Sequence, residues 1–198
     1  MSDKELFGVL SLALSVVAYA PYIWSMLRRR IRPHLLSWTV WSLISLIATL
    51  AQQTGNAGPG GWAVMFSTVS CTFIALCAFR YGERTISRLD WVCFLGALSA
   101  IPLWRLASDP LASLLLVLAI DTIAYGMTFR KAWRAPWSEN ATVYWVDTVK
   151  YGAAMLAMDS YSVLAILFPI YVIVIEGAMA VMILWRQRQL SQQVAQRT

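Results

Sequence analysis

The stretch that decides the fold is residues 18–41, "AYAPYIWSMLRRRIRPHLLSWTVW". A proline lies inside an apolar run, four arginines crowd the short turn that follows, and the next apolar run contains two tryptophans three residues apart. Two apolar runs joined by a short basic turn are typical of membrane helices connected by a cytoplasmic loop. The competing interpretation of the arginines is a DNA-binding patch.

The composition of the whole chain decides between these interpretations. Of its 198 residues, 59% are hydrophobic and only 13% are charged, and the mean hydropathy is +0.61. Soluble domains carry about 25% charged residues, so this chain has too little charge to cover a water-soluble globule. The net charge of +6 lies in short clusters between apolar runs, which indicates cytoplasmic loops and argues against a nucleic-acid partner.

Seven segments are apolar over the roughly 20 residues that a membrane-crossing helix needs. The first lacks the basic leader and cleavage site of a signal peptide, so we expect it to be retained. The sequence therefore predicts an all-α integral membrane protein with seven transmembrane helices. The predicted spans are 6–27, 34–54, 61–80, 89–107, 111–131, 140–158 and 161–185.

The distribution of lysine and arginine between the connectors predicts the orientation. On the side opposite to the basic loops only Lys4 and Arg105 are found, and Lys150 lies within a span. By the positive-inside rule, the N-terminus is outside and the C-terminus is cytoplasmic. The basic residues on the cytoplasmic side are Arg28, Arg29, Arg30, Arg32, Arg80, Arg84, Arg88, Arg130, Lys131, Arg134, Arg186, Arg188 and Arg197.

The two halves of the chain resemble one another. "LALSVVAYAP" at 12–21 matches "LAIDTIAYGM" at 118–127 with an offset of 106, so that Tyr19 corresponds to Tyr125. Each segment runs into a basic loop that contains a proline and then into a span that carries a tryptophan, Trp38 or Trp145. This order predicts two parallel repeats of three helices joined by an odd crossing helix, a 3+1+3 arrangement. The three parts are 1–80 (helices 1–3), 81–109 (linker helix 4) and 110–198 (helices 5–7 with a short cytoplasmic tail).

Two triple-helix bundles joined by one helix, with Pro21 near the cytoplasmic end of the first helix, resemble the SWEET and PQ-loop transporter superfamily. "RPHLLSWTVW" at 32–41 further resembles a group of bacterial membrane proteins of this architecture. The resemblance implies transport by alternating access in a bacterial inner membrane, sugars as common cargo, and Pro21 as a hinge. The glutamine that often follows this proline is replaced by Tyr22, and the second repeat has Met127 where the first has Pro21.

Four charged residues lie away from the ends of the predicted spans, near the helix centres, and all four are in the second repeat: Asp121, Asp147, Lys150 and Glu176. Each costs about 2.5–3.5 kcal/mol at the centre of a membrane helix, so each calls for a reason. Asp147 and Lys150 are three residues apart and within reach of one another as an ion pair on one helix. Alternatively, Lys150 pairs with Asp121 or Glu176, which leaves a carboxylate free to titrate or to bind substrate. If all four were ionised, the formal excess would be −2.

The second span supplies a polar and aromatic face that includes Trp41, Ser45 and Gln52. This face either lines a cavity, with Trp41 stacking on a flat or sugar-like ligand, or packs against a neighbouring helix through its small residues. The predicted substrate-binding or coupling residues are Asp121, Asp147, Lys150, Glu176, Trp41, Ser45, Gln52 and Tyr125, with Pro21 as the hinge.

These features favour a transporter or facilitator of a small polar solute, such as a sugar, vitamin, nucleoside or amino-acid-like compound, with proton coupling left open. A retinal protein would need a lysine in its last span, and a metal-dependent enzyme would need more ligands than the single His34 offers. We therefore expect no enzymatic activity, no cofactor and no metal. A sensor or assembly subunit of the same fold is the alternative, and the expected partners are the lipid bilayer and the solute, with a homo-oligomer left open.

Overall fold

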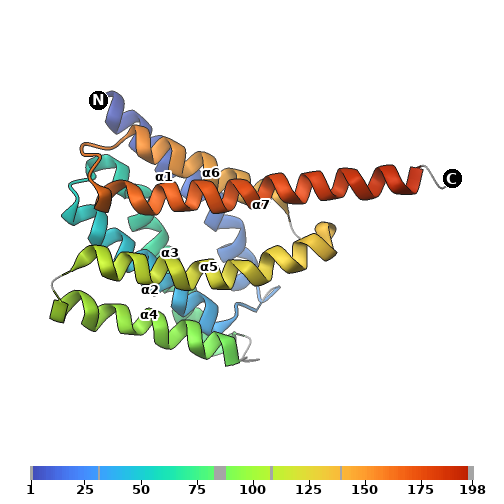
Figure 1. Ribbon diagram of the computed structural model, residues 1–198, viewed down its shortest axis with the longest axis horizontal. Helices are drawn as coiled ribbons and strands as arrows, with labels where there is room; N and C mark the ends of the chain where they lie inside the picture. The colour runs from blue at the N-terminus through green and yellow to red at the C-terminus, as the bar shows by residue number, and fades with distance from the viewer. Residues whose placement is uncertain (1, 31, 83–87, 108, 139, 196–198) are drawn as a thin grey trace.

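The computed structural model describes residues 2–30, 32–82, 88–107, 109–138 and 140–195. Over these residues the chain is helical and contains no strand, as the sequence predicts. Two short 3-10 turns, η1 (Gly58–Gly61) and η2 (Pro136–Ser138), precede α3 and α6 (Figure 1). The α-helices of the described chain are α1 (Asp3–Leu27), α2 (Leu35–Thr54), α3 (Trp62–Tyr81), α4 (Arg88–Ala107), α5 (Pro110–Arg134), α6 (Ala141–Leu156) and α7 (Val163–Ala195).

Side chains cap the first turns of several helices, among them α1, α2 and α6. At the start of α1, the Ser2 hydroxyl accepts from the Glu5 N–H and the Glu5 carboxylate accepts from the Ser2 N–H, which is a capping box. The Nδ1 atom of His34 accepts from the Ser37 N–H at the start of α2. Asn140 caps α6 through its side-chain oxygen. These caps satisfy N–H groups that have no partner within the helix.

Four helical segments are long and apolar enough to cross a membrane: Asp3–Leu27, Leu35–Thr54, Gly58–Arg80 and Val163–Gln193. Shorter apolar stretches occur at Phe94–Leu103 and Pro110–Gly126. Over the described residues the structure thus confirms an all-helical chain with several helices long and apolar enough to cross a membrane, whereas spans at α4, α5 and α6 stay predictions. At 16 residues, α6 is about 24 Å long, shorter than the roughly 30 Å hydrocarbon core.

The last helix is longer than the apolar pattern indicates. The predicted span ends at 185, but α7 continues to Ala195 and projects beyond the other helices (Figure 1). The added turns pack near the end of α5, because Arg186 Nε donates to the Trp133 carbonyl over 3.2 Å and Gln187 Nε2 donates to the Pro136 carbonyl over 2.9 Å. The predicted cytoplasmic tail therefore begins as helix, which its Gln, Arg and Leu residues favour.

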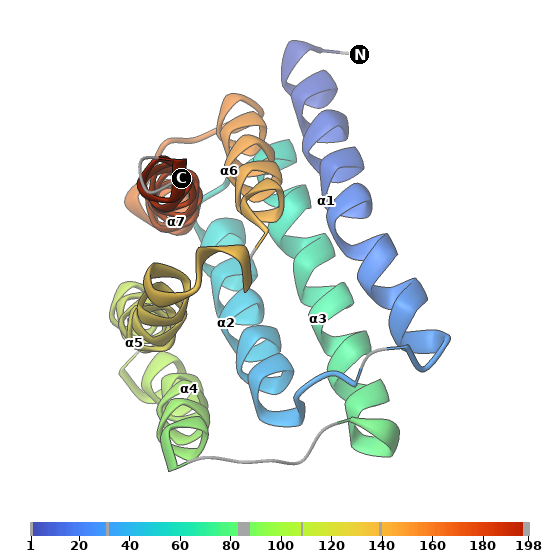
Figure 2. The ribbon, with the colours of Figure 1, turned by 90° about the vertical axis from the view of Figure 1, so that its right-hand side faces the viewer.

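α3 lies between α1 and α2, and α7 packs against both α5 and α6 (Figure 2). α1 packs even more extensively against α6 than against α3, α2 also packs against α5 and α7, and α4 covers α5 and α2. Figure 2 also shows α4, α5 and α7 nearly end-on while α1, α2 and α3 run obliquely to them.

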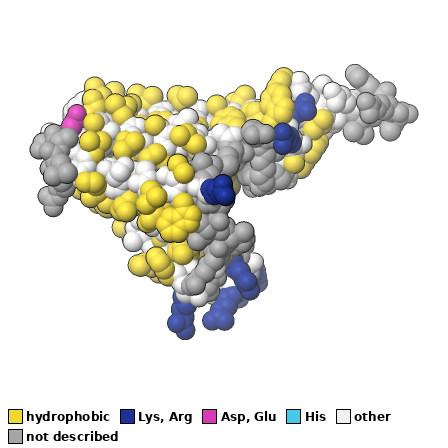
Figure 3. All heavy atoms as spheres, turned by 60° about the horizontal axis from the view of Figure 1, so that its bottom comes forward, with side chains coloured by type: hydrophobic (Ala, Val, Ile, Leu, Met, Phe, Trp, Pro, Cys, Tyr) yellow, Lys and Arg dark blue, Asp and Glu magenta, His cyan; other side chains and the backbone are white. Residues whose placement is uncertain are grey.

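The core between the helices is apolar, and so is much of the outer surface. Ile44, Val117 and Phe168 are among the buried side chains where α2, α5 and α7 meet. Large apolar side chains such as Leu76 and Val174 are exposed. Figure 3 shows hydrophobic side chains over much of one face, with Lys and Arg gathered toward the side from which α7 projects. An apolar exterior of this kind belongs in lipid.

The loop that follows α2 is hydrogen-bonded to the loop between α6 and α7. The Asp159 N–H donates to the Ala57 carbonyl over 3.1 Å, and the Ser162 hydroxyl donates to the Gly55 carbonyl over 2.9 Å. Gly58 beside them has a φ of 59°, a left-handed conformation that glycine adopts without strain. Among the residues behind the orientation prediction, Arg84 and Arg197 lie outside the described residues, as do the side chains of Arg105, Arg130 and Lys131.

Candidate functional site

A buried ion pair lies on the inner face of α6. The Lys150 Nζ is 2.8 Å from Asp147 Oδ1; the lysine is fully buried and the Asp147 side chain is 24% exposed. Of the two arrangements open from the sequence, the structure forms the pair within one helix, as the spacing of three residues allows. A buried ammonium beside a single carboxylate is held by charge, and loss of the carboxylate would leave that charge uncompensated.

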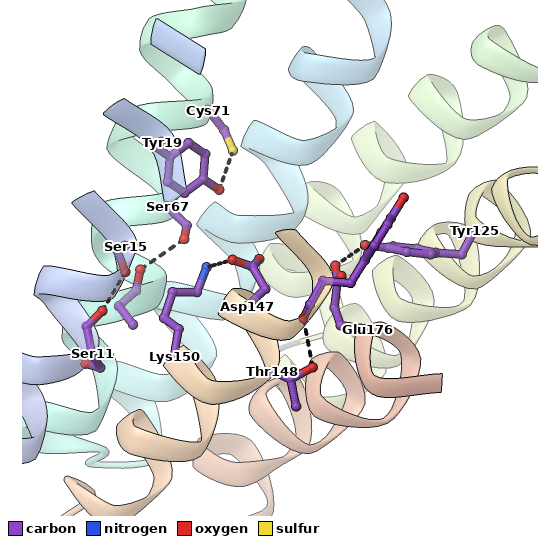
Figure 4. Close-up of polar contacts among 12 residues, drawn as sticks. Ser11, Ser15, Tyr19, Ser67, Cys71, Tyr125, Asp147, Thr148, Lys150 and Glu176 are labelled. Carbon is purple, nitrogen blue, oxygen red and sulfur yellow. Dashed lines mark hydrogen bonds and ion pairs between the residues drawn. The ribbon is translucent and has the colours of Figure 1, made fainter. Parts of the chain in front are cut away.

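Tyrosine rings surround the ammonium of Lys150. The Nζ atom is 4.5 Å from the ring centroid of Tyr151 and 5.6 Å from that of Tyr19 on α1, distances at which a cation is attracted to an aromatic face. The Tyr19 hydroxyl in turn contacts Cys71 Sγ of α3 over 3.4 Å (Figure 4). The ion pair is therefore enclosed by α1, α3 and α6.

Two hydrogen bonds between tyrosines and carboxylates connect α5 and α7. The Tyr171 hydroxyl of α7 donates to Asp121 Oδ2 of α5 over 3.1 Å. One turn further along, the Tyr125 hydroxyl of α5 donates to Glu176 Oε1 of α7 (Figure 4). Each helix thus contributes one tyrosine and one carboxylate, and the two bonds run in opposite directions between the helices.

The ion pair and the two carboxylates form one charged cluster, which we define as Asp121, Asp147, Lys150 and Glu176. Glu176 interacts electrostatically with Asp147, Lys150 and Asp121. Asp121 and Glu176 are each only 7% exposed. Three carboxyl groups thus share one buried ammonium. Such a group of charges in a low-dielectric interior favours the binding of a proton or of a cationic group.

One carboxylate oxygen of this cluster lacks a partner of normal hydrogen-bond geometry. Asp121 Oδ1 is buried and accepts no hydrogen bond of that geometry from the part of the chain that the structure describes. The side chain of Trp41 on α2 interacts with the same carboxylate as a donor. Because buried acceptors are nearly always paired, an open one beside an aromatic ring is suited to a ligand that donates a hydrogen bond.

The predicted face of α2 divides into a packed part and an exposed part. Ser45 donates to the carbonyl oxygens of Trp41 and Ser42 in its own helix. Gln52 Nε2 donates to the Ala165 carbonyl of α7 over 3.1 Å, at the end of the molecule opposite to α7's projecting turns. Both side chains are buried, whereas Trp41 is 40% exposed. Ser45 and Gln52 thus pack between helices, Gln52 with its Oε1 atom buried and unpaired among the described residues, and Trp41 lies beside the Asp121 carboxylate.

Pro21 lies inside α1 with its ring exposed. A proline has no N–H, so the carbonyl of Val17 lacks its usual donor within the helix. This local weakness is what a hinge requires, but it is on the helix that holds Tyr19 rather than on a helix of the charged cluster.

The described side chains include no group of three or more His, Cys, Asp or Glu arranged to hold a metal ion. Comparison of the chain with known protein families, with characterised proteins and with solved structures gives no match. The function must therefore be argued from the residues themselves.

Sequence reasoning identified the four charged residues and Tyr125 but missed Tyr171, the donor to Asp121. A tyrosine in an apolar span looks like any other lipid-facing aromatic, and its partner is 50 residues away on another helix. The available signal was the similar spacing of a tyrosine and a carboxylate in the two spans. Asp121 lies four residues before Tyr125, and Tyr171 lies five residues before Glu176.

Proposed function

We propose that the chain is a membrane transporter of a small polar solute and that the charged cluster is its solute or coupling site. The observation that carries the proposal is the burial of two carboxyl groups and one ammonium among apolar helices, with a third, partly exposed carboxylate paired with that ammonium. Polar groups at such depth are expensive and mark substrate or proton pathways in membrane proteins. The solute would be a sugar, vitamin, nucleoside or amino-acid-like compound, with proton transfer at a carboxyl group as the coupling step.

The proposal includes two triple-helix repeats joined by α4, with the N-terminus outside, as in the SWEET and PQ-loop superfamily that the sequence resembles. Three observations support it: the packing of α3 with α1 and α2, that of α7 with α5 and α6, and the contacts of two corresponding tyrosines. Tyr19 of α1 contacts Cys71 of α3, and Tyr125, its counterpart at an offset of 106, donates to Glu176 of α7.

The cluster suggests how a solute would be held. Asp121 Oδ1 would accept from a hydroxyl or amino group, and Trp41 would cover an apolar or ring-shaped part of the solute. Lys150 is occupied by Asp147 and would maintain the charge balance rather than bind directly. Alternating access would move the α5–α7 unit against the α1–α3 unit, with Pro21 absorbing the bend in α1.

Uptake into proteoliposomes from a mixed pool of labelled metabolites tests the proposal. We expect flux in the wild type and its loss in Asp121→Asn, since the amide keeps the shape but removes the charge. Asp159→Asn, which alters an exposed aspartate in the loop before α7, is the matched control and should transport normally. Wild-type protein without flux but with solute-dependent thermal stabilisation would instead identify a sensor.

A further inference from the structure

An apolar groove with a volume of about 230 Å³ lies between α1 and α3. α1 lines it from Val16 to Leu27, and α3 lines it through Phe66. At 1.5 Å per residue, the α1 part is about 16 Å long, close to half of the roughly 30 Å hydrocarbon core. The groove therefore has the length of the acyl region of one leaflet.

The groove is apolar because its one polar residue turns its hydroxyl away. Tyr19 presents its ring to the groove beside Phe66, with 6.3 Å between the ring centroids, while its hydroxyl contacts Cys71. Ala20, the smallest lining residue on α1, leaves room in the middle. A hydrocarbon chain fits this lining, whereas a polar solute would find no hydrogen-bond partner there.

Cations lie at one end of the groove. The guanidinium carbon of Arg28 is 4.2 Å from the ring centroid of Trp24, and Trp24 itself lines the groove. Arg28, Arg29 and Arg30 are exposed, and none has a carboxylate partner among the described residues. Arginines that only fix the orientation of a loop need no specific contact. The Arg28 guanidinium, in contrast, packs against Trp24 in the groove wall.

At the same end of the groove, an arginine occupies a backbone conformation that glycine adopts more readily. Arg29 has a φ of 55° directly after α1. Helices commonly end on a residue in this left-handed conformation, and that residue is usually glycine. The arginine at this position adds a second cation beside Arg28 at a backbone position that does not favour it.

From these observations we propose that the groove between α1 and α3 binds an anionic phospholipid. One acyl chain lies along the groove from Val16 to Leu27, and the phosphate is bound by Arg28 and Arg29. A basic pocket beside membrane helices is the kind of site that binds anionic headgroups. The site is separate from the charged cluster, although Tyr19 contributes a wall to the groove and lies 5.6 Å from Lys150 Nζ.

Lipid binding to the purified full chain, measured by native mass spectrometry with added phosphatidylglycerol or phosphatidylcholine, tests the proposal without any transport assay. We expect the wild type to prefer phosphatidylglycerol by about five-fold or more, the contribution of one arginine near an anionic headgroup. Arg28→Gln should lose most of this preference. Arg29→Gly should also weaken it while leaving the fold at least as stable, because glycine suits the backbone there.

Matched controls separate this site from general attraction between charges. Arg134→Gln removes an exposed arginine at the end of α5, and Val69→Phe adds an aromatic ring to an exposed position of α3 outside the groove; neither should change lipid binding. Ala20→Phe fills the groove and should reduce the retention of both lipids. If Ala20→Phe does not fold, Arg28→Gln and Arg29→Gly still decide. Equal binding of the two lipids, equal losses in Arg134→Gln, or a second copy of the chain seated on α1 would overturn the proposal.

Discussion

In the α1–α3 and α5–α7 pairs, two tyrosines that correspond at an offset of 106 contact the partner helix through different chemistry. In the first pair, Tyr19 contacts a thiol, Cys71, and in the second, Tyr125 donates to a carboxylate, Glu176. The positions one turn earlier are Ser15 in the first pair and Asp121 in the second. Ser15 donates to a carbonyl of its own helix, whereas Asp121 accepts from Tyr171.

This difference makes the α1–α3 pair electrically neutral and places carboxylates in the α5–α7 pair. Hydroxyl and thiol contacts within membranes contribute little to packing energy, about 0.6 kcal/mol on average, and they leave the first pair neutral. Carboxylates at the same positions create a strongly interacting group that needs compensation. The compensation comes from Lys150 on α6, which lies beside Tyr19 of the first pair and interacts with Glu176 of the second.

The largest effect is expected from removing the carboxylate that balances Lys150. Asp147→Asn should lower the free energy of unfolding by about 3 kcal/mol, because it leaves a fully buried ammonium without its counter-ion. Thermal or denaturant unfolding in detergent measures the loss. The double variant Asp147→Asn/Lys150→Met should recover to within about 1 kcal/mol of the wild type. A double variant as unstable as Asp147→Asn alone would show that the ion pair is not the cause.

A smaller effect is expected from the two corresponding tyrosines. Tyr125→Phe should lower the free energy of unfolding by about 2 kcal/mol, because hydrogen bonds to charged groups contribute about 1.5–3 kcal/mol. Tyr19→Phe removes only a contact with a thiol, a weak acceptor, and should lower it by about 0.5 kcal/mol. Unfolding measured side by side in the same detergent compares them. Equal losses would show that the two helix pairs do not differ in this way.

An effect of the opposite sign is expected at Pro21, which has methionine at the corresponding position of the second half. Pro21→Ala restores a helix hydrogen bond and should raise the free energy of unfolding by about 1 kcal/mol, less than in a soluble helix because membranes tolerate proline. If Pro21 acts as the hinge, the same variant should slow uptake despite its greater stability. A variant with unchanged uptake would remove Pro21 from the mechanism.

The sequence predicted those features that depend on spacing along one helix. The helical fold follows from the apolar runs, and the Asp147–Lys150 pair follows from a spacing of three residues. The partners of Asp121 and Glu176 depend on how α5 packs against α7, which no local pattern records. For Gln52 and Ser45 the sequence left cavity lining and helix packing open, because a polar face suits either water or a neighbouring helix. In the structure both are buried: Gln52 Nε2 donates to α7, and Ser45 donates within α2.

The central claim is that the charged cluster of the second half handles the solute, and one matched flux measurement tests it most directly. Glu176→Gln and Cys71→Ser change the partners of the corresponding tyrosines Tyr125 and Tyr19 and can be compared in proteoliposomes at equal amounts of folded protein. We predict that Glu176→Gln lowers uptake by about tenfold or more, because the amide still accepts from Tyr125 but carries no charge and binds no proton, while Cys71→Ser transports like the wild type. Normal uptake by Glu176→Gln, or an equal loss in both variants, would contradict the account.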